Sequence, residues 1–220
     1  MEITYKNKNM NTAERHKNFI DRDKLYAIIE GEVPTESQVD QILNYALKLK
    51  GIGLGDVGAL LRVTDSKQIH KIMETAKIIK EEIYGKRLVL FAPLYTGNVC
   101  VNNCTYCSFR KDNKLIKRKI LTMDEIAQET SALLKQGHKR VLLICGENNK
   151  NGTDYMIEAL RTTYGVKERD GRDYIRRINV ELAPMEVNDF ARLKQERIGT
   201  YVCFQETYDE LMYERFHPKG

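Results

Sequence analysis

The chain has 220 residues, of which 42% are hydrophobic and 30% are charged, and its formal net charge is +5. A chain of this length can bury a real core, and this composition excludes an intrinsically disordered protein. The longest apolar run, Leu88–Tyr95, is only as long as a strand, so no membrane partner is expected.

Residues 1–86 are expected to form a helical region. Amphipathic patterns and capping residues predict four helices: Phe19–Glu30, one that starts at Pro34 and Thr35 and runs to Lys50, Gly55–Val63, and one capped by Asp65 or Ser66 that ends near Tyr84. Gly53, Gly55 and Gly58 satisfy the dinucleotide fingerprint G-x-G-x-x-G. That fingerprint needs a preceding strand, and here a helix is expected instead, so we interpret these residues as C-cap and loop glycines.

From residue 87 the pattern changes to alternating strands and helices. Four apolar strands are expected: Leu88–Tyr95, Arg140–Cys145, Arg176–Leu182 and Thr200–Phe204. Three helices are expected between them: one from the capping box at Thr122 and Glu125 to Gln136, one around Asp154–Tyr164, and Val187–Lys194. This alternation predicts an α/β fold with a parallel sheet and right-handed crossovers.

Polar or metal-binding residues lie near the carboxyl end of each predicted strand or directly after it. They are Cys100–Cys107, Gly146–Glu147, Glu181 and Gln205–Tyr208. Ligands of parallel sheets bind beyond the carboxyl ends of the strands, so these four groups are expected to converge on one site.

Cys100, Cys104 and Cys107 are spaced C-x3-C-x2-C, with no fourth cysteine nearby. A 4Fe–4S cluster normally takes four thiolates, one for each iron. Three thiolates would therefore leave one iron open to a ligand that is not protein. An open coordination position is what makes a metal site catalytic rather than structural.

Other interpretations of the cysteines remain open. A zinc site would need a fourth Cys or His at the usual spacing, and a redox pair of Cys104 and Cys107 would leave Cys100 unexplained. Disulfides are not expected, because the five cysteines are an odd number and no secretory signal precedes them. Free cysteines without a leader predict a cytoplasmic location.

The densest basic stretch is Arg110–Lys119. We expect a solvated loop here, and we advance the docking of an acidic electron donor as a hypothesis. Nucleic acid is not an expected partner, because the stretch lacks interleaved aromatic residues and a binding fold.

The cysteine motif after a first barrel strand, with Tyr106 before its last cysteine, resembles the radical S-adenosylmethionine (SAM) superfamily. Within this superfamily the chain resembles the tyrosine lyases. The resemblance lies in FAPLYTGNVCVNNCTYC, in Gly146–Glu147, and in IGTYVCFQETY followed by His217–Pro218. Two groups compete, the maturase of iron-only (FeFe) hydrogenase and 2-iminoacetate synthase of thiamine biosynthesis. The chain looks closer to the maturase in three segments: KEEIYGKRLVLFAPLY, GHKRVLL and RRINVELAP.

This resemblance implies a helical region, residues 1–86, followed over residues 87–220 by about four βα units of a radical SAM partial TIM barrel. It implies that the three cysteines hold a 4Fe–4S cluster whose open iron binds SAM. Tyr106 would contact the adenine of SAM, and Glu147, with the backbone of Gly146, its amino group. Glu181 and Glu206 would contact the ribose or the ammonium group.

The implied reaction begins with one-electron cleavage of SAM to methionine and a 5′-deoxyadenosyl radical. The radical abstracts hydrogen from the amino group of L-tyrosine, and the Cα–Cβ bond breaks to give dehydroglycine (2-iminoacetate) and p-cresol. The hydrogenase maturase goes on to make carbon monoxide and cyanide. The implied electron donor has a low potential, as flavodoxin and ferredoxin do.

The chain departs from the family in length. A full barrel has about 250 residues and eight strands, and only four strands fit here. We therefore expect an N-terminal fragment without the tyrosine-binding residues, poorly soluble and inactive on tyrosine by itself. A truncated, non-catalytic iron–sulfur module is the alternative. Cys145 and Cys203 are expected to be small buried hydrophobic residues rather than further ligands.

Overall fold

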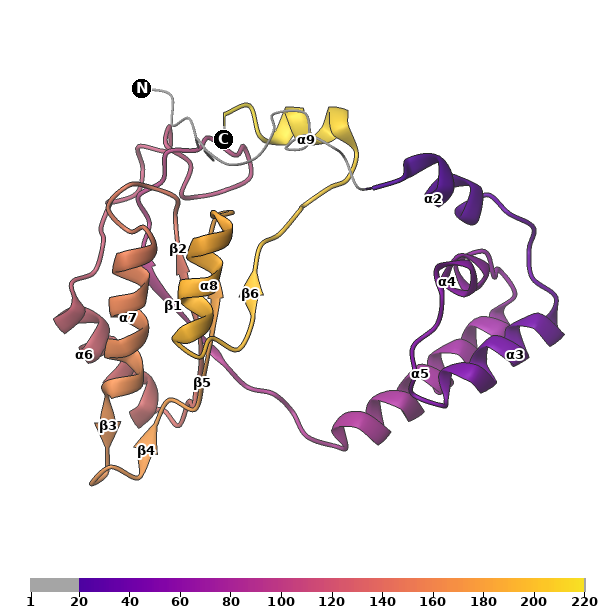
Figure 1. Cartoon of the computed structure of the whole chain (residues 1–220), viewed down its shortest axis with the longest axis horizontal. Helices are drawn as coiled ribbons and strands as arrows, with labels where there is room; N and C mark the ends of the chain where they lie inside the picture. The colour runs from indigo at the N-terminus through magenta and orange to yellow at the C-terminus, as the bar shows by residue number, and fades with distance from the viewer. Residues whose placement is uncertain (1–19, 220) are drawn as a thin grey trace. The chain divides into compact units, whose positions relative to one another are not determined.

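The computed structural model describes residues 20–219, which belong to two compact units divided between Leu88 and Val89. The N-terminal unit contains the helices α2 (Arg22–Ile29), α3 (Glu36–Ala46), α4 (Leu54–Leu61) and α5 (Ser66–Tyr84) (Figure 1). The expected helix starts are confirmed at two of them. Thr35 forms a capping box with Gln38 at the start of α3, and Asp65 accepts a hydrogen bond from the Gln68 amide at the start of α5.

The glycines of the G-x-G-x-x-G pattern are not the C-cap and loop glycines that the sequence predicts. Gly53 is the N-cap of α4, and Gly55 and Gly58 lie inside that helix. A Cβ on Gly58 would lie 2.8 Å from the backbone oxygen of Ile28 in α2. This glycine therefore permits α2 and α4 to pack closely. No strand precedes the pattern in residues 20–53, as expected for a segment that is not a dinucleotide turn.

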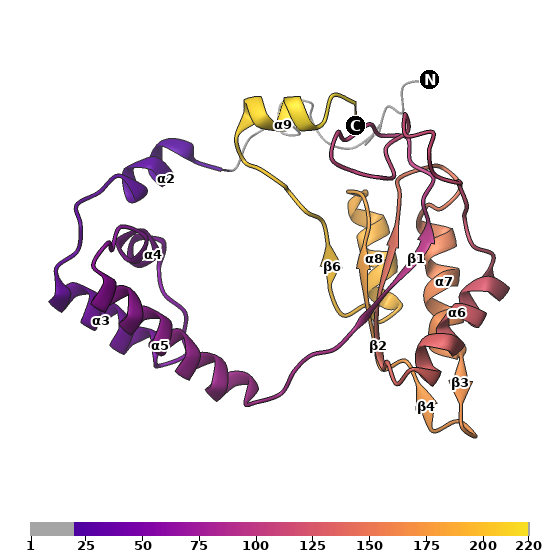
Figure 2. The ribbon, with the colours of Figure 1, turned by 180° about the vertical axis from the view of Figure 1, so that it is seen from behind.

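The C-terminal unit is built on a four-stranded parallel sheet with the order β1-β2-β5-β6. Its strands are Ala92–Gly97 (β1), Arg140–Cys145 (β2), Arg177–Glu181 (β5) and Tyr201–Val202 (β6), and the helices between them are α6 (Met123–Lys135), α7 (Thr153–Gly165) and α8 (Val187–Gln195). Because the strands are adjacent in chain order, right-handed crossovers place all three helices on one face (Figures 1 and 2). The predicted α/β fold is confirmed.

The core of this unit lies between the sheet and these helices. Alternate residues of the strands point into it and are fully buried, among them Val141, Leu143, Ile178 and Val180. They pack against apolar residues of the helices: Ile126, Leu134, Met156, Leu160 and Leu193. Burial of these side chains fixes the register of the strands, since a shift of one residue would turn them to the other face.

Several predicted boundaries are wrong. The first strand begins at Ala92 rather than Leu88, and Leu88–Phe91 has no strand pairing and is exposed. The fourth strand is shortened to Tyr201–Val202. The sequence interpretation also missed the hairpin of β3 (Lys167–Glu168) and β4 (Asp173–Tyr174), and the helix α9 (Glu210–Phe216).

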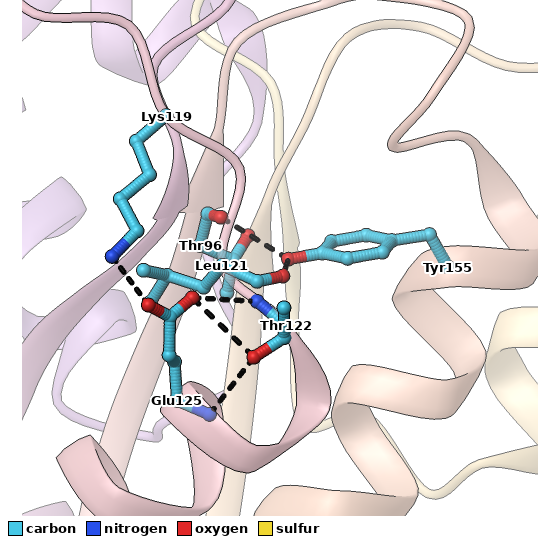
Figure 3. A network of polar contacts seen from close by, with 6 residues as sticks. All are labelled: Thr96, Lys119, Leu121, Thr122, Glu125 and Tyr155. Carbon is cyan, nitrogen blue, oxygen red and sulfur yellow. Dashed lines mark hydrogen bonds and ion pairs between the residues drawn. The ribbon is translucent and has the colours of Figure 1, made fainter.

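A polar network ties the end of β1 to α6 and α7 (Figure 3). The hydroxyl group of Tyr155 lies 3.1 Å from the carbonyl oxygen of Thr96 and 2.8 Å from that of Leu121. Thr122 and Glu125 form the predicted capping box of α6. Burial raises the pKa of Tyr155 to about 12, so its hydroxyl group remains a hydrogen-bond donor. The network holds both ends of the loop between β1 and α6.

We predict that Tyr155→Phe lowers the free energy of unfolding by about 1 kcal/mol, because two partly buried carbonyl groups lose their shared donor. Urea denaturation measures the change. Tyr174→Phe is the matched control, since Tyr174 is 43% exposed, and its stability should equal that of the wild type. An equal loss in both variants would contradict the role given to Tyr155.

Candidate functional site

The parallel register brings the carboxyl ends of the four strands to one edge of the sheet. Gly97 at the end of β1 pairs with Cys145, and Ile144 of β2 pairs with Glu181 of β5. Glu181 in turn pairs with Val202 of β6. The cysteine segment, Gly146–Glu147, Glu181 and the residues after β6 therefore all lie at this edge.

The cysteines lie on a loop, residues 98–119, that is closed at its base. Gly97 and Ile120 form an antiparallel bridge where the chain leaves β1 and returns to α6. Asn98 extends this closure with both backbone and side chain. Its amide donates to the carbonyl oxygen of Lys119 at 3.0 Å, and its Nδ2 donates to that of Lys117 at 2.8 Å. The thiols are thus carried on one shaped segment rather than on a free connection.

Cys100, Cys104 and Cys107 are all free thiols and partly buried. Burial, followed by the charges of Cys107 and Cys100, raises the pKa of Cys104, which favours the neutral thiol in the absence of a metal. The amide of Phe109 donates to Sγ of Cys107 at 3.4 Å. These features suit a ligand set that becomes stable once a positive metal centre binds.

Within residues 20–219, no three His, Cys, Asp or Glu side chains are grouped around a position for one metal ion. A 4Fe–4S cluster does not need its thiolates to surround one position, because each thiolate binds a separate iron. The chemistry of the three thiols, together with the amide donor to Cys107, fits such a cluster.

Gly146 packs against the cysteine loop. Its amide donates to the carbonyl oxygen of Gly97 at 3.0 Å, and it is buried. A Cβ at this position would lie 2.5 Å from the carbonyl oxygen of Val99 and 3.0 Å from Cβ of Cys100. Only glycine permits this approach, since real Cβ contacts are not shorter than 3.0 Å.

Glu147 is attached to the same loop by its backbone and by its side chain. Its carbonyl oxygen accepts the Val101 amide at 2.8 Å, and its Oε2 accepts Nδ2 of Asn102 at 2.6 Å. The carboxylate therefore has a fixed orientation beside the cysteines.

Asparagine side chains hold this junction together, and the sequence interpretation missed their role. Asn148 donates to the carbonyl oxygen of Val99 at 2.9 Å, and the buried Asn151 donates to that of Gly146 at 2.8 Å. From the sequence, Asn102 and Asn103 stand out only as residues that suit turns. The visible signal is the density of amide side chains on both sides of the junction, in VNNC and ENNKN.

Tyr106 is held by the last residue of α9 and the residue that follows it. Its hydroxyl group lies 2.8 Å from Nε2 of His217, and its ring meets the ring of Phe216 edge-on. Loss of water around the hydroxyl group, followed by the charges of Cys104 and Glu206, raises the pKa of Tyr106. The backbone joins the same two segments, because the Thr105 amide donates to the carbonyl oxygen of Phe216 at 2.9 Å.

Glu181 and Glu206 lie near each other at the edge of the sheet. Burial, followed by the charge of Glu206, raises the pKa of Glu181. Glu206 has a φ of 59°, a left-handed conformation that is unfavourable for a glutamate. Two neighbouring carboxylates create a site that favours a cation.

The basic stretch divides into two sets, so the expected solvated loop is only partly correct. Arg110 and Arg118 are partly buried and donate to backbone carbonyl groups of the loop. Lys111, Lys114 and Lys117 are exposed, and none of the three forms an ion pair within residues 20–219.

A family model of the radical SAM superfamily matches residues 94–220, and the chain belongs to this superfamily. Membership implies a 4Fe–4S cluster and SAM as its cofactors.

Particular relatives are similar over most of the chain. The 2-iminoacetate synthase of Escherichia coli (strain K12) is 31% identical over 202 residues, which cover 91% of this chain and 50% of that protein. The solved structure of HydG, a maturase of the [FeFe]-hydrogenase, is 41% identical with a TM-score of 0.80, covering 90% of this chain and 43% of HydG. The solved structure of HydG from Carboxydothermus hydrogenoformans is 35% identical with a TM-score of 0.72. The match covers 90% of this chain and 44% of the HydG chain.

The chain spans about half the length of the curated relatives that it matches. The expected radical SAM partial-barrel fold is confirmed by the structural similarity. No helix within residues 20–219 is long and apolar enough to cross a membrane.

We predict that Cys145 is alkylated slowly by iodoacetamide. Burial raises its pKa to about 11, so about one thiol in a thousand is ionised at pH 8, and the thiolate is the reactive form. Cys203 is exposed, so the expectation that it is a buried residue is wrong. It should react at least about 100-fold faster than Cys145. Peptide mass spectrometry measures both rates, and the Cys145 rate should rise about tenfold with each pH unit up to 11. Equal rates at pH 8 would contradict this prediction.

Proposed function

We propose that the chain forms the cluster- and SAM-binding part of a radical SAM lyase that cleaves the Cα–Cβ bond of L-tyrosine, giving 2-iminoacetate and p-cresol. The proposed role is maturation of the [FeFe]-hydrogenase H-cluster, with supply of carbon monoxide and cyanide. The observation that carries the proposal is the shaped loop with three free thiols, against which Gly146 and Glu147 pack. The 41% identity to HydG supports the choice of this lyase.

In this proposal Cys100, Cys104 and Cys107 hold three irons of the cluster. When bound, the cluster supplies the single electron that cleaves SAM. The protein contributes placement and exclusion of water. Glu147, oriented by Asn102, accepts a hydrogen bond from the amino group of the methionine part of SAM, and the adjacent backbone of Gly146 contacts the same group.

Tyr106, Glu181 and Glu206 complete the proposed SAM site. The contact with His217 fixes the Tyr106 ring as a surface for adenine. Glu181 and Glu206 interact with each other. A sulfonium or ammonium cation between them would relieve the repulsion between the two carboxylates. Such pairs strengthen in a partly desolvated site.

A second candidate is 2-iminoacetate synthase of thiamine biosynthesis. It is favoured by the 31% and 32% identity to two curated enzymes of that name over more than nine tenths of the chain. Both candidates cleave tyrosine in the same way and differ in what becomes of the product, so the cofactor site described above serves either.

The first test is anaerobic reconstitution of the chain with iron and sulfide. We expect about four irons per chain and an EPR signal of the reduced cluster that changes on addition of SAM. Cys107→Ser should lose the cluster, and Cys203→Ser is the matched control that keeps it. Retention of zinc, or an EPR signal that ignores SAM, would contradict the proposal and favour a non-catalytic metal-binding module.

The lyase activity is tested on the complete product of the gene. With SAM, dithionite and L-tyrosine it should release p-cresol. Carbon monoxide release would then favour the hydrogenase maturase over 2-iminoacetate synthase. Cleavage of SAM without any cresol would refute the tyrosine-lyase assignment.

We further propose that an acidic donor of low potential, a flavodoxin or ferredoxin, docks on Lys111, Lys114 and Lys117, which are exposed on the cysteine loop itself. Replacing all three with Gln should weaken donor binding several-fold and flatten its dependence on salt. Replacement of Lys67, Lys77 and Lys80 of α5 with Gln is the control that makes the same change in net charge. A wild-type affinity that does not respond to salt would rule the docking surface out.

A further inference from the structure

We propose that Arg118 is a positioning residue that shapes the cysteine loop before any cofactor binds. Its guanidinium group binds four backbone carbonyl groups, and its link to the cofactor rests on the proposed function of the cysteines. Nη1 donates to Asn98 at 2.6 Å and to Phe109 at 2.7 Å. Nη2 donates to Arg110 at 2.6 Å and to Asn113 at 3.0 Å.

These four acceptors lie on both sides of the cysteine motif. Asn98 precedes Cys100, and the other three residues follow Cys107. A single side chain thus joins the two arms of the loop. Without it, each of these partly buried carbonyl groups would lose a donor, and within residues 20–219 only that of Arg110 would keep another, the Asn113 amide. Such a loss is costly.

The contacts of Arg118 extend to the third cysteine. Arg118 binds the carbonyl oxygen of Phe109, and the amide of the same Phe109 donates to Sγ of Cys107. The carbonyl oxygen of Cys107 accepts from the backbone and the side chain of Arg110, whose own carbonyl oxygen is bound by Arg118. The backbone around this thiol is therefore oriented by the guanidinium group.

An arginine is required by this geometry. Four of its five N–H groups are used, in a planar fork that reaches acceptors in different directions. A lysine offers three donors on one point charge and cannot bind all four carbonyl groups. Arg118 has no carboxylate partner within residues 20–219, so a role in a surface ion pair does not account for it.

The test compares Arg118→Lys and Arg118→Met with the control Lys117→Met, which removes an exposed charge next to it. In the metal-free chain, amide hydrogen exchange of residues 98–119 should be at least tenfold faster in both Arg118 variants and unchanged in the control. Exchange in the strands of the sheet should remain as in the wild type, which shows that the fold is retained. Unchanged exchange in the loop of Arg118→Lys would overturn the proposal.

A second measurement connects the loop to the cofactor. After reconstitution, loss of cluster absorbance in the presence of a chelator should be at least tenfold faster in Arg118→Lys than in the control. Equal rates would overturn the link to the cofactor. If the wild type takes up no cluster, the proposed function fails, whereas hydrogen exchange in the metal-free chain still decides the role of Arg118.

Discussion

The candidate site depends on the close approach of Gly146 to the cysteine loop. The position of a Cβ at residue 146 is only 2.5 Å from the carbonyl oxygen of Val99, so any side chain would push the two segments apart. That movement would break the hydrogen bonds from Val101 and Asn102 to Glu147. One missing side chain thus allows the ends of β1 and β2 to form a single surface.

This contact is possible because the sheet delivers both segments to the same edge. The buried residues of the strands, such as Leu143 and Val180, fix the parallel register. Tyr155 and the capping box of Thr122 then hold the returning end of the loop at the sheet. Stability of the core and geometry of the site are therefore linked through a small number of backbone hydrogen bonds.

The elements that could be predicted from sequence are those with a local cause. Asp65 and Thr122 start helices by capping them, and the apolar run of Arg140–Cys145 forms a strand with the predicted bounds. The run Leu88–Phe91 was misassigned, because hydrophobicity does not show whether another segment covers a residue. Helix α9 was missed because its seven residues are rich in charge and bury none of their side chains.

In the site, too, features with a local cause could be predicted and those that depend on distant contacts could not. The cysteines and the Gly146–Glu147 pair stand out in the sequence, because soft ligands at so short a spacing are typical of metal and redox centres. Arg118 could not be distinguished from its basic neighbours, since all have the same charge and only the fold turns Arg110 and Arg118 inward. Asn102 likewise gains its role from a partner 45 positions away.

The hydrogen bonds between the cysteine loop and the end of the chain have a consequence for biosynthesis. The amides of Asn103 and Thr105 bind carbonyl groups of Lys219 and Phe216, which are translated more than 100 residues later. A nascent chain on the ribosome cannot complete this pairing until those residues emerge. The loop therefore reaches its final shape only after residues 216–219 have been synthesised.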